Sequence, residues 1–458
     1  LIAVAAAPRI VSMLSTSRSL VRLDLQIDWR LLAFLAGAGA LVTVLFGLAP
    51  AFRVSGVSPN QALTSVRHTV RIGLFRPLVA AQAAFSFVVL FVGGLSLASF
   101  AKLVRTDLGF DQSNLAIVNL QARELRQSGT NPLAIWAQLL ERLRLSPGVQ
   151  SASLSGWGLF EGRGRNKSVR IPGRPVDTYD PWYLPISPRF LETMRIPLVD
   201  GRDFEWRDAQ SGIPLPVIVN ESFARRYFPG ESPLGRRFFR VDGGNTLVAQ
   251  HIIGVAGDAK YTSIRQTTPP TVYDPFWPEG WAAVQLRTRM EGGTVAALLR
   301  DELPRIHPAF RLGDVTMQST LVGNTLVRDR ALALLSGFFS VVAIVLVAVG
   351  VYGVLSYSVV QRTREIGIRL ALGARPLRVV ALVVSQVCLM ATIGLVAGAA
   401  GGLAVSCYIT SLLYQVKPSD FRSIAGPLIA LILACALSAL LPALRATRVD
   451  PTTALRYD

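Results

Sequence analysis

The chain has 458 residues, of which 51% are hydrophobic and only 17% charged, and its formal net charge is +18. This balance is typical of membrane proteins and disfavours an ordinary soluble domain. Most of the basic excess lies in and around the long apolar stretches, so it indicates membrane topology and argues against a nucleic-acid surface.

The N-terminal region resembles the end of a longer unit. The sequence does not begin with Met and shows no signal-peptide pattern, so we expect the C-terminal part of a longer protein. Residues 31–52 are uncharged and long enough for one complete transmembrane helix. The ending at 48–63, LAPAFRVSGVSPNQAL, recurs at 440–455 as LLPALRATRVDPTTAL with eight identical positions. This internal repeat predicts that 1–63 is the tail of a first repeat.

The next boundaries follow from charge. Residues 64–76 carry Arg67, Arg71 and Arg76 and no acid, which predicts a cytoplasmic linker. Residues 77–101 then form an apolar transmembrane helix that runs outward. From 102 to 330 charges of both signs are mixed with proline and tryptophan, which indicates a soluble outer domain large enough for its own core.

Within this outer domain, short β-branched runs alternate with helical patterns, so we predict an α+β fold. The expected strands are 115–120, 149–154, 217–219, 252–255 and 283–286, and the expected helices are 132–145, 188–194, 221–227 and 294–306. The Gly-rich stretch 154–165 is expected to be a flexible loop.

Three further apolar stretches follow. Residues 331–360 exceed the length needed to cross a bilayer and are expected to project as a stalk. Residues 379–408 and 423–444 are expected to be transmembrane helices joined by a short outer loop at 409–422, and 445–458 to be a cytoplasmic tail. In the first of these helices Gly394, Gly398 and Gly402 form a small-residue face for close helix packing, within one subunit or at a dimer seam.

The segment 361–378 separates two of these spans and is rich in arginine, with Glu365 as its one acid. Its basic character predicts a cytoplasmic position. Ile366, Leu370 and Ala374 recur every four residues, which favours a short amphipathic helix over a solvated basic loop.

Three phrases carry a resemblance to a known family. The run RTREIGIRLALGA at 362–374 resembles the cytoplasmic coupling segment of MacB/FtsX-type ABC transporter permeases. ISPRFLETMRIPLVDGRDF and VIVNESFARRYFPGESPLGRRF resemble the extracytoplasmic domain of the same family. The resemblance implies a multi-pass α-helical membrane protein with an inserted α+β extracytoplasmic (periplasmic) domain. It also implies ATPase-coupling residues, namely Arg362, Arg364, Glu365, Ile366, Gly367, Arg369, Leu372, Gly373 and Ala374.

The resemblance further implies an inner-membrane permease subunit for export or mechanotransmission, coupled to a cytoplasmic ABC ATPase in a bacterial cell. The internal repeat resembles the tandem-duplicated orphan permeases, so the second permease half is expected in cis or from a homodimer. A periplasmic protein and membrane lipids are further expected partners, and nucleic acid is not. The alternative is a non-transporting, FtsX-like scaffold or regulator of a periplasmic partner.

The sequence offers little for catalysis. It contains no Gly-Lys pair and therefore no phosphate-binding GxxxxGK[ST] loop, so we expect no cofactor and ATP hydrolysis, if any, by a partner subunit. No metal site is expected, because Cys388, Cys407 and Cys435 show no CxxC spacing and lie far from histidine. The remaining candidates have structural explanations: His68, His251, His307, Asp203, Glu221 and Asp258. A membrane-bound enzyme with its active site in 102–330 is the least favoured alternative.

Overall fold

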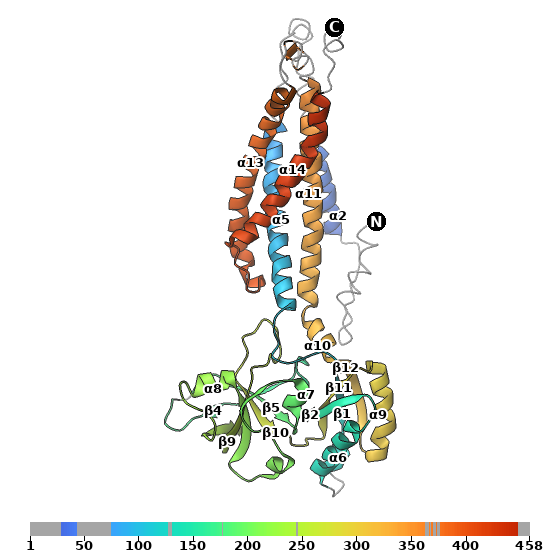
Figure 1. Cartoon of the computed structure of the whole chain (residues 1–458), viewed down its shortest axis with the longest axis vertical. Helices are drawn as coiled ribbons and strands as arrows, with labels where there is room; N and C mark the ends of the chain where they lie inside the picture. Colours follow the sequence, from blue (N-terminus) through green and yellow to red (C-terminus); the bar gives the residue numbers. More distant parts are fainter. Residues whose placement is uncertain are drawn as a thin grey trace. The chain divides into compact units, whose positions relative to one another are not determined.

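The computed structural model describes residues 29–43, 75–126, 131–175, 177–243, 246–361, 366, 368–369, 372 and 376–447. The chain divides into two units (Figure 1). The helical unit comprises Leu1–Lys102 and Arg328–Asp458, and the α/β unit comprises Leu103–Val327. The predictions for 1–28, for most of the linker 64–76 and for the tail 448–458 lie outside the described residues, as does the first copy of the internal repeat.

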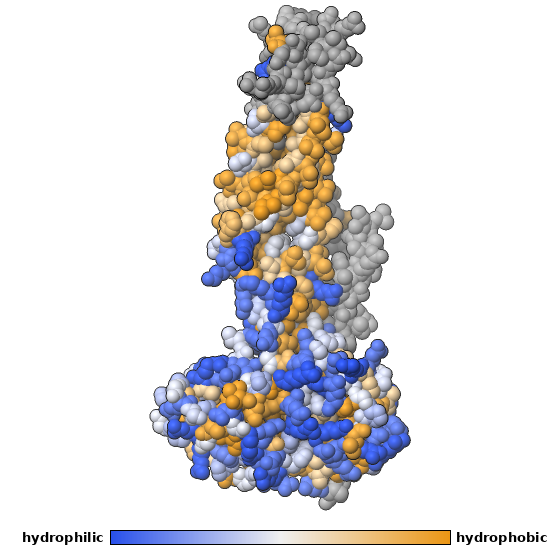
Figure 2. Space-filling view, viewed as in Figure 1, coloured by the Kyte–Doolittle hydropathy of each residue, from blue (hydrophilic) through white to orange (hydrophobic). Residues whose placement is uncertain are grey.

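The helical unit contains four described helices that are long and apolar enough to cross a membrane. They are α5 (Phe75–Val104), α11 (Val327–Gln361), α13 (Pro376–Ile409) and α14 (Phe421–Thr447). A fifth helix, α2 (Trp29–Thr43), covers part of the expected first span. Hydrophobic residues cover most of the described surface of these helices (Figure 2), as expected for side chains that face lipid.

The helices of this unit begin and end at other residues than the uncharged stretches that predicted them. Helix α11 begins at Val327 and therefore includes Arg328, Asp329 and Arg330, which the sequence placed in the outer domain. Asp329 lies in the first turn, where a negative charge is favourable to the helix dipole. Arg422, expected in the outer loop, lies in the first turn of α14. A membrane helix can continue into water through charged residues. The first charged residue therefore marks the edge of the apolar span and not the end of the helix.

The α/β unit is built on one twelve-stranded mixed sheet with the order β12-β1-β11-β2-β5-β10-β7-β9-β8-β4, to which β3 and β6 add at β5 and β9. Only Ser155 and Ile186 pair β2 with β5, so the sheet consists of two halves joined by a narrow connection. The strands are β1 (Leu115–Gln121), β2 (Val149–Ser155), β3 (Arg165–Asn166), β4 (Val169–Arg170), β5 (Trp182–Ile186), β6 (Leu198–Gly201), β7 (Leu215–Asn220), β8 (Arg237–Asp242), β9 (Thr246–Ala256), β10 (Thr271–Pro275), β11 (Trp281–Thr288) and β12 (Arg311–Met317).

Each half of the sheet has its own core. In the first, α6 (Pro132–Arg144) and α9 (Gly292–Ile306) cover β1, β2 and β11, and Trp136 is fully buried among Phe276 and Phe310. In the second, α8 (Glu221–Tyr227) packs Phe223 onto the strands β7 to β10. Three smaller elements complete the unit: α7 (Phe190–Met194), η4 (Trp206–Gln210) and α10 (Gln318–Thr325).

The predicted α+β fold is confirmed, and every predicted strand and helix of this unit is present with bounds that differ by a few residues. Seven strands were missed: the short β3, β4 and β6, and the longer β5, β8, β10 and β12. Their sequences, such as WYLPI and TVYDP, contain proline or charged residues and lack a period of two.

The Gly-rich loop between β2 and β3 is not the flexible segment that the sequence suggested. Trp157, Leu159 and Phe160 are buried. The indole N–H of Trp157 donates to the hydroxyl of Tyr261, and the backbone N–H of Phe160 donates to the Tyr261 carbonyl at 2.9 Å. Its aromatic side chains anchor this loop in the core. The prediction relied on the glycine content and gave no weight to these aromatic residues.

Candidate coupling site in the helical unit

The three glycines of α13 lie against α5 at very short range. A Cβ on Gly398 would lie 2.7 Å from the carbonyl oxygen of Ala84, and one on Gly394 would collide with the carbonyl of Ala80. A Cβ on Gly402 would lie 3.0 Å from the Phe91 ring. The small-residue face thus allows two helices to approach within one chain, as the packing interpretation requires.

Helix α5 also approaches α11 closely. The side-chain amide of Gln82 donates to the Leu346 carbonyl at 2.6 Å, which satisfies a polar group within a span. Gly93 lies against Ser336 and Ser340 of α11, where a Cβ would have no room. Neither Gln82 nor Gly93 was among the predicted packing residues, although an uncharged amide inside an apolar stretch is a recognisable signal. Helix α5 therefore contacts both α11 and α13.

The loop between α13 and α14 is attached to the same helix. The backbone N–H of Tyr414 donates to Ser99 Oγ at 2.9 Å, and the ammonium group of Lys102 donates to the carbonyl of Gln415. The α13–α14 pair is therefore held to α5 both along the helices and at the end where α5 enters the α/β unit.

The predicted coupling segment is 361–378, of which Gln361 ends α11 and 376–378 begin α13; between these helices the structure describes four residues. Ile366 is buried and belongs to the core cluster of the helical unit, together with Val79 of α5 and Val359 of α11. Ile368 is 42% exposed and Leu372 is 82% exposed, and the Leu372 N–H donates to the Ile368 carbonyl at 3.0 Å, a helical contact. Arg369 is half-buried.

The other predicted coupling residues, Arg362, Arg364, Glu365, Gly367, Gly373 and Ala374, lie outside the described residues. The chain enters the α/β unit after α5 and leaves it before α11, and both helices are candidate membrane spans.

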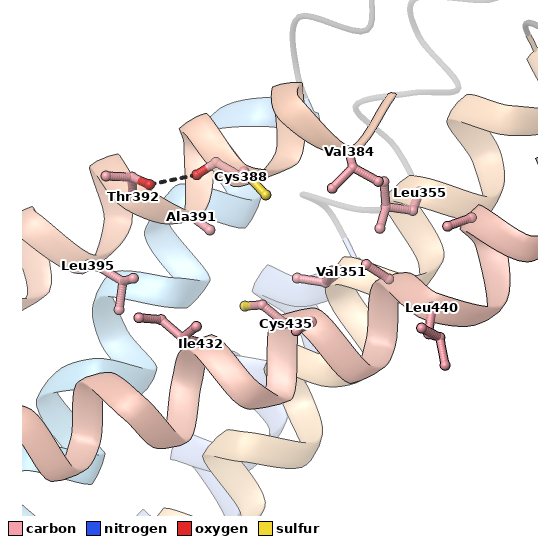
Figure 3. A pocket seen from close by; sticks show the side chains of 13 residues that line it. Val351, Leu355, Val384, Cys388, Ala391, Thr392, Leu395, Ile432, Cys435 and Leu440 are labelled. Atoms are coloured by element: carbon pink, nitrogen blue, oxygen red, sulfur yellow. Dashed lines mark hydrogen bonds between the residues drawn. The ribbon is translucent and has the colours of Figure 1, made fainter. Parts of the chain in front are cut away.

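An apolar pocket of about 470 Å³ lies between α11, α13 and α14 near this segment (Figure 3). Cys388 and Cys435 both line it, together with Val351, Leu355 and Leu395. Cys388 and Cys407 are exposed and Cys435 is half-buried, and all three are free cysteines.

The described histidines and carboxylates have structural partners. His251 Nδ1 lies 3.2 Å from the Pro214 carbonyl, and His307 caps the end of α9, where its Nδ1 accepts from the Ala309 N–H. Asp258 accepts from the backbone N–H and hydroxyl of Ser222, both at 2.8 Å, at the start of α8. Glu221 lies in the first turn of that helix, as predicted. His68 lies outside the described residues.

Asp203 is the candidate with an altered acidity. Burial raises the pKa of its carboxyl, although the backbone N–H groups of Phe204 and Arg189 donate to it at 2.8 and 3.0 Å and oppose the rise. The described residues contain no cluster of three or more His, Cys, Asp or Glu side chains that could hold a metal ion. These contacts account for the polar residues as parts of the fold.

The fold is thus that of a multi-span helical membrane protein with an inserted extracytoplasmic α+β domain. Residues 78–304 match the MacB-like periplasmic core domain, and residues 337–451 match the FtsX-like permease C-terminal domain. The chain belongs to the MacB/FtsX-type ABC transporter permease family.

Similar proteins include two curated exporters. The macrolide export ATP-binding/permease protein MacB of Marinobacter nauticus is 28% identical over 285 residues, which are 58% of this chain and 42% of that protein. The pyoverdine export ATP-binding/permease protein PvdT of Pseudomonas putida is 24% identical over 279 residues, 58% of this chain and 41% of that protein. The matches thus span about two fifths of the length of these relatives.

One similar solved structure is the periplasmic region of MacB from Actinobacillus actinomycetemcomitans. It is 15% identical, covers 48% of this chain and 95% of that chain, and gives a TM-score of 0.32.

Proposed function

We propose that this chain is the permease part of an ABC-type export or mechanotransmission system in a bacterial inner membrane. A separate cytoplasmic ATPase would act on the segment between α11 and α13, and the helices would pass the movement to the α/β unit in the periplasm. The names of the two relatives, which join export, ATP binding and permease, support this assignment. The 458 residues contain no GxxxxGK[ST] phosphate-binding loop, so the proposal assigns ATP hydrolysis to a partner and a mechanical role to these residues.

The proposal rests on a difference in burial among the described residues between 366 and 372. Ile366 is buried in the helical core, whereas Ile368 and Leu372 are exposed apolar side chains in an Arg-rich segment. Apolar anchors surrounded by arginine are typical of the centre of a protein interface. A partner that binds Leu372 would therefore be linked through one short helical turn to the core of the bundle.

The core offers a continuous route from this segment to the other side. Ile366 shares its cluster with residues of α5, α11 and α14. Helix α5 is joined to α11 by Gln82 and to α13 by the glycine contacts, so these helices are expected to move together. Both α5 and α11 continue into the α/β unit, which would receive the displacement directly.

Partners follow from this role. The ATPase is the first, and a second permease half, in cis or from another copy, would complete a symmetric pair. The apolar surface of the helices would contact membrane lipids. The cargo would be an amphipathic compound, a peptide or a lipid-linked protein.

The test is site-specific photocrosslinking of the full-length protein in its host membrane. A crosslinker at Leu372 should capture a protein that contains GxxxxGK[ST] by mass spectrometry, and one at Leu389, which is 58% exposed within α13, should not. Leu372→Asp should reduce ATPase co-purification at least tenfold because a charge replaces the apolar anchor, and Leu372→Met should retain it.

Failure to capture an ATPase at an accessible Leu372 would contradict the proposal. In that case capture of a periplasmic protein from a crosslinker in the α/β unit would favour the FtsX-like scaffold instead. Equal ATPase capture from Leu372 and Leu389 would show that the segment is not the contact.

A further inference from the structure

A pocket of about 270 Å³ lies in the α/β unit beside the half of the sheet that contains β5 and β10. Its walls come from β3, β5, the start of β7, β8, the end of β10, η4 and the loop after β10. Three carboxylates and two arginines line it. Only those charged groups that are not already paired within the protein could bind a ligand.

The two buried carboxylates are fully engaged. Asp274 accepts from Gln250 Nε2 at 3.0 Å and from Arg240 Nη1 at 3.1 Å. Asp208 accepts from both terminal nitrogens of Arg202 at 2.7 and 2.9 Å, and from the backbone N–H of Glu205. Arg240 is also held by Asp242. These groups form the rigid frame of the pocket and leave little capacity for a ligand.

Arg165 is different. Its Nε–H is buried and has no hydrogen-bond partner among the residues that the structure describes, and its Nη1 lies 3.5 Å from Glu279 Oε1, at the limit of a hydrogen bond. The neighbouring Gly164 packs directly on the Trp182 ring, where a Cβ would not fit, so the backbone that carries Arg165 is fixed. Buried unpaired donors are rare in folded proteins. The Arg165 side chain is nevertheless 38% exposed, so the outer nitrogens of its guanidinium are the least engaged charged donors on the pocket wall and can meet an acceptor from a ligand.

Trp277 supplies a flat apolar wall. It is 62% exposed, between the buried Phe276 and Pro278, and it lines both this pocket and an adjoining one of about 360 Å³. Pro185, Leu215 and Pro275 complete the apolar lining. At about 30 Å³ per water, 270 Å³ holds roughly nine waters, or a ligand of about ten non-hydrogen atoms.

We propose that this pocket binds a small carboxylate that carries a flat apolar group. The carboxylate accepts from the guanidinium of Arg165, as a charge-assisted contact, and displaces the weak contact with Glu279. The ring packs against Trp277 and the proline walls. This inference does not depend on an ATPase partner, because every residue that it uses belongs to the α/β unit.

The probe is phenylacetate, which has about the expected size. Its dissociation constant for the full chain in lipid nanodiscs would be measured by saturation-transfer NMR, with empty nanodiscs as the blank. We expect a value of the order of 1 mM. Phenylacetamide, equal in size and neutral, should bind at least tenfold more weakly, and acetate, which lacks the ring, should show no saturable binding.

Four variants examine the contacts. Arg165→Gln and Trp277→Ala should each weaken phenylacetate binding about tenfold. Arg163→Gln, the matched control, should leave it unchanged because Arg163 lies over the Trp281 ring and not in the pocket. Glu279→Gln should tighten it about two- to fivefold, since it removes the competing carboxylate.

The proposal is wrong if phenylacetate and phenylacetamide bind the wild-type chain equally, or if no saturable binding occurs at 10 times the expected dissociation constant. Weaker binding in Glu279→Gln would also overturn it, because that result would indicate a site for a cation. The comparison of probes on the wild-type protein and the Glu279 variant remains decisive even if Arg165→Gln fails to fold.

Discussion

In the helical unit, small residues allow backbones to approach: Gly394 and Gly398 meet carbonyls of α5 and Gln82 donates to a carbonyl of α11. In the α/β unit, buried charged side chains join segments that are distant in sequence. Arg287, 4% exposed, donates from Nε to the Thr193 carbonyl at 2.8 Å, from Nη1 to the Ser113 carbonyl at 2.8 Å, and from Nη2 to the Asp111 carbonyl at 2.9 Å.

The difference follows from the two solvents. In lipid a helix satisfies its own backbone, so close packing is the main means of association and charges are costly. In water a sheet with long crossovers leaves loop carbonyls to be satisfied, and an arginine fork can hold three of them at once. Substitutions that remove one kind of contact should therefore affect one unit and leave the other folded.

The largest effect is expected for Arg287→Met. It would leave three carbonyls and Asp111, 3.2 Å from Nη1, without this donor, at a cost of about 3–5 kcal/mol in the stability of the α/β unit. Intrinsic fluorescence during urea unfolding would report it, since six of the seven tryptophans lie within 103–327. Arg289→Met is the control because Arg289 is exposed, and equal effects of the two would contradict the argument.

Gly398→Ala should destabilise the helical unit by about 1–3 kcal/mol, because its Cβ would lie 2.7 Å from the Ala84 carbonyl oxygen. Gly353→Ala, where a Cβ would meet no atom within 4 Å, should be neutral or stabilising. Unfolding in increasing sodium dodecyl sulfate, followed by far-UV circular dichroism, would compare them. A neutral Gly398→Ala would show that α13 is not held to α5 by this contact.

A smaller and pH-dependent effect is expected at Asp208. Burial alone would raise the pKa of its carboxyl, but the hydrogen bonds from Arg202 and Glu205 outweigh burial and lower the pKa. Because the folded pKa is lower than the unfolded value near 3.9, the stabilisation is present above that value and is lost as pH falls through the folded pKa.

Asp208→Asn should therefore cost the α/β unit about 1 kcal/mol at pH 7, a modest figure because Arg202 is half exposed to solvent, and should flatten the loss of stability below about pH 4. Urea unfolding at several pH values would measure both effects. Parallel pH profiles for the variant and the wild type would exclude Asp208 as the titrating group.

The smallest effect is expected for Gln82→Leu. Interhelical hydrogen bonds in membranes are worth about 0.6 kcal/mol on average, so the loss of the contact with the Leu346 carbonyl should be close to that value. The detergent titration used for Gly398→Ala would measure it. If Gln82→Leu destabilised the helical unit more than Gly398→Ala does, hydrogen bonding would contribute more than close packing to the association of these helices.

Several parts of the molecule could be predicted because the signal was local. The amphipathic pattern of 132–145 and 294–306 and the apolar runs of β1 and β11 led directly to elements that the structure contains. The phrases at 186–204 and 217–238, with the run at 362–374, indicated the family. Strands β5 and β10 could not be found in this way, because they are defined by their parallel pairing with each other and not by their own pattern.

The sequence by itself indicated the family and four apolar stretches that the structure forms as helices long enough to cross a membrane, because lipid and water select composition over stretches of about 20 residues. The tertiary structure alone decided which contacts matter. Arg165 and Glu279 are more than a hundred positions apart, and Arg287 meets Asp111 only because β11 lies beside β1. Such contacts depend on chain crossovers, which leave no periodic trace in the residues themselves.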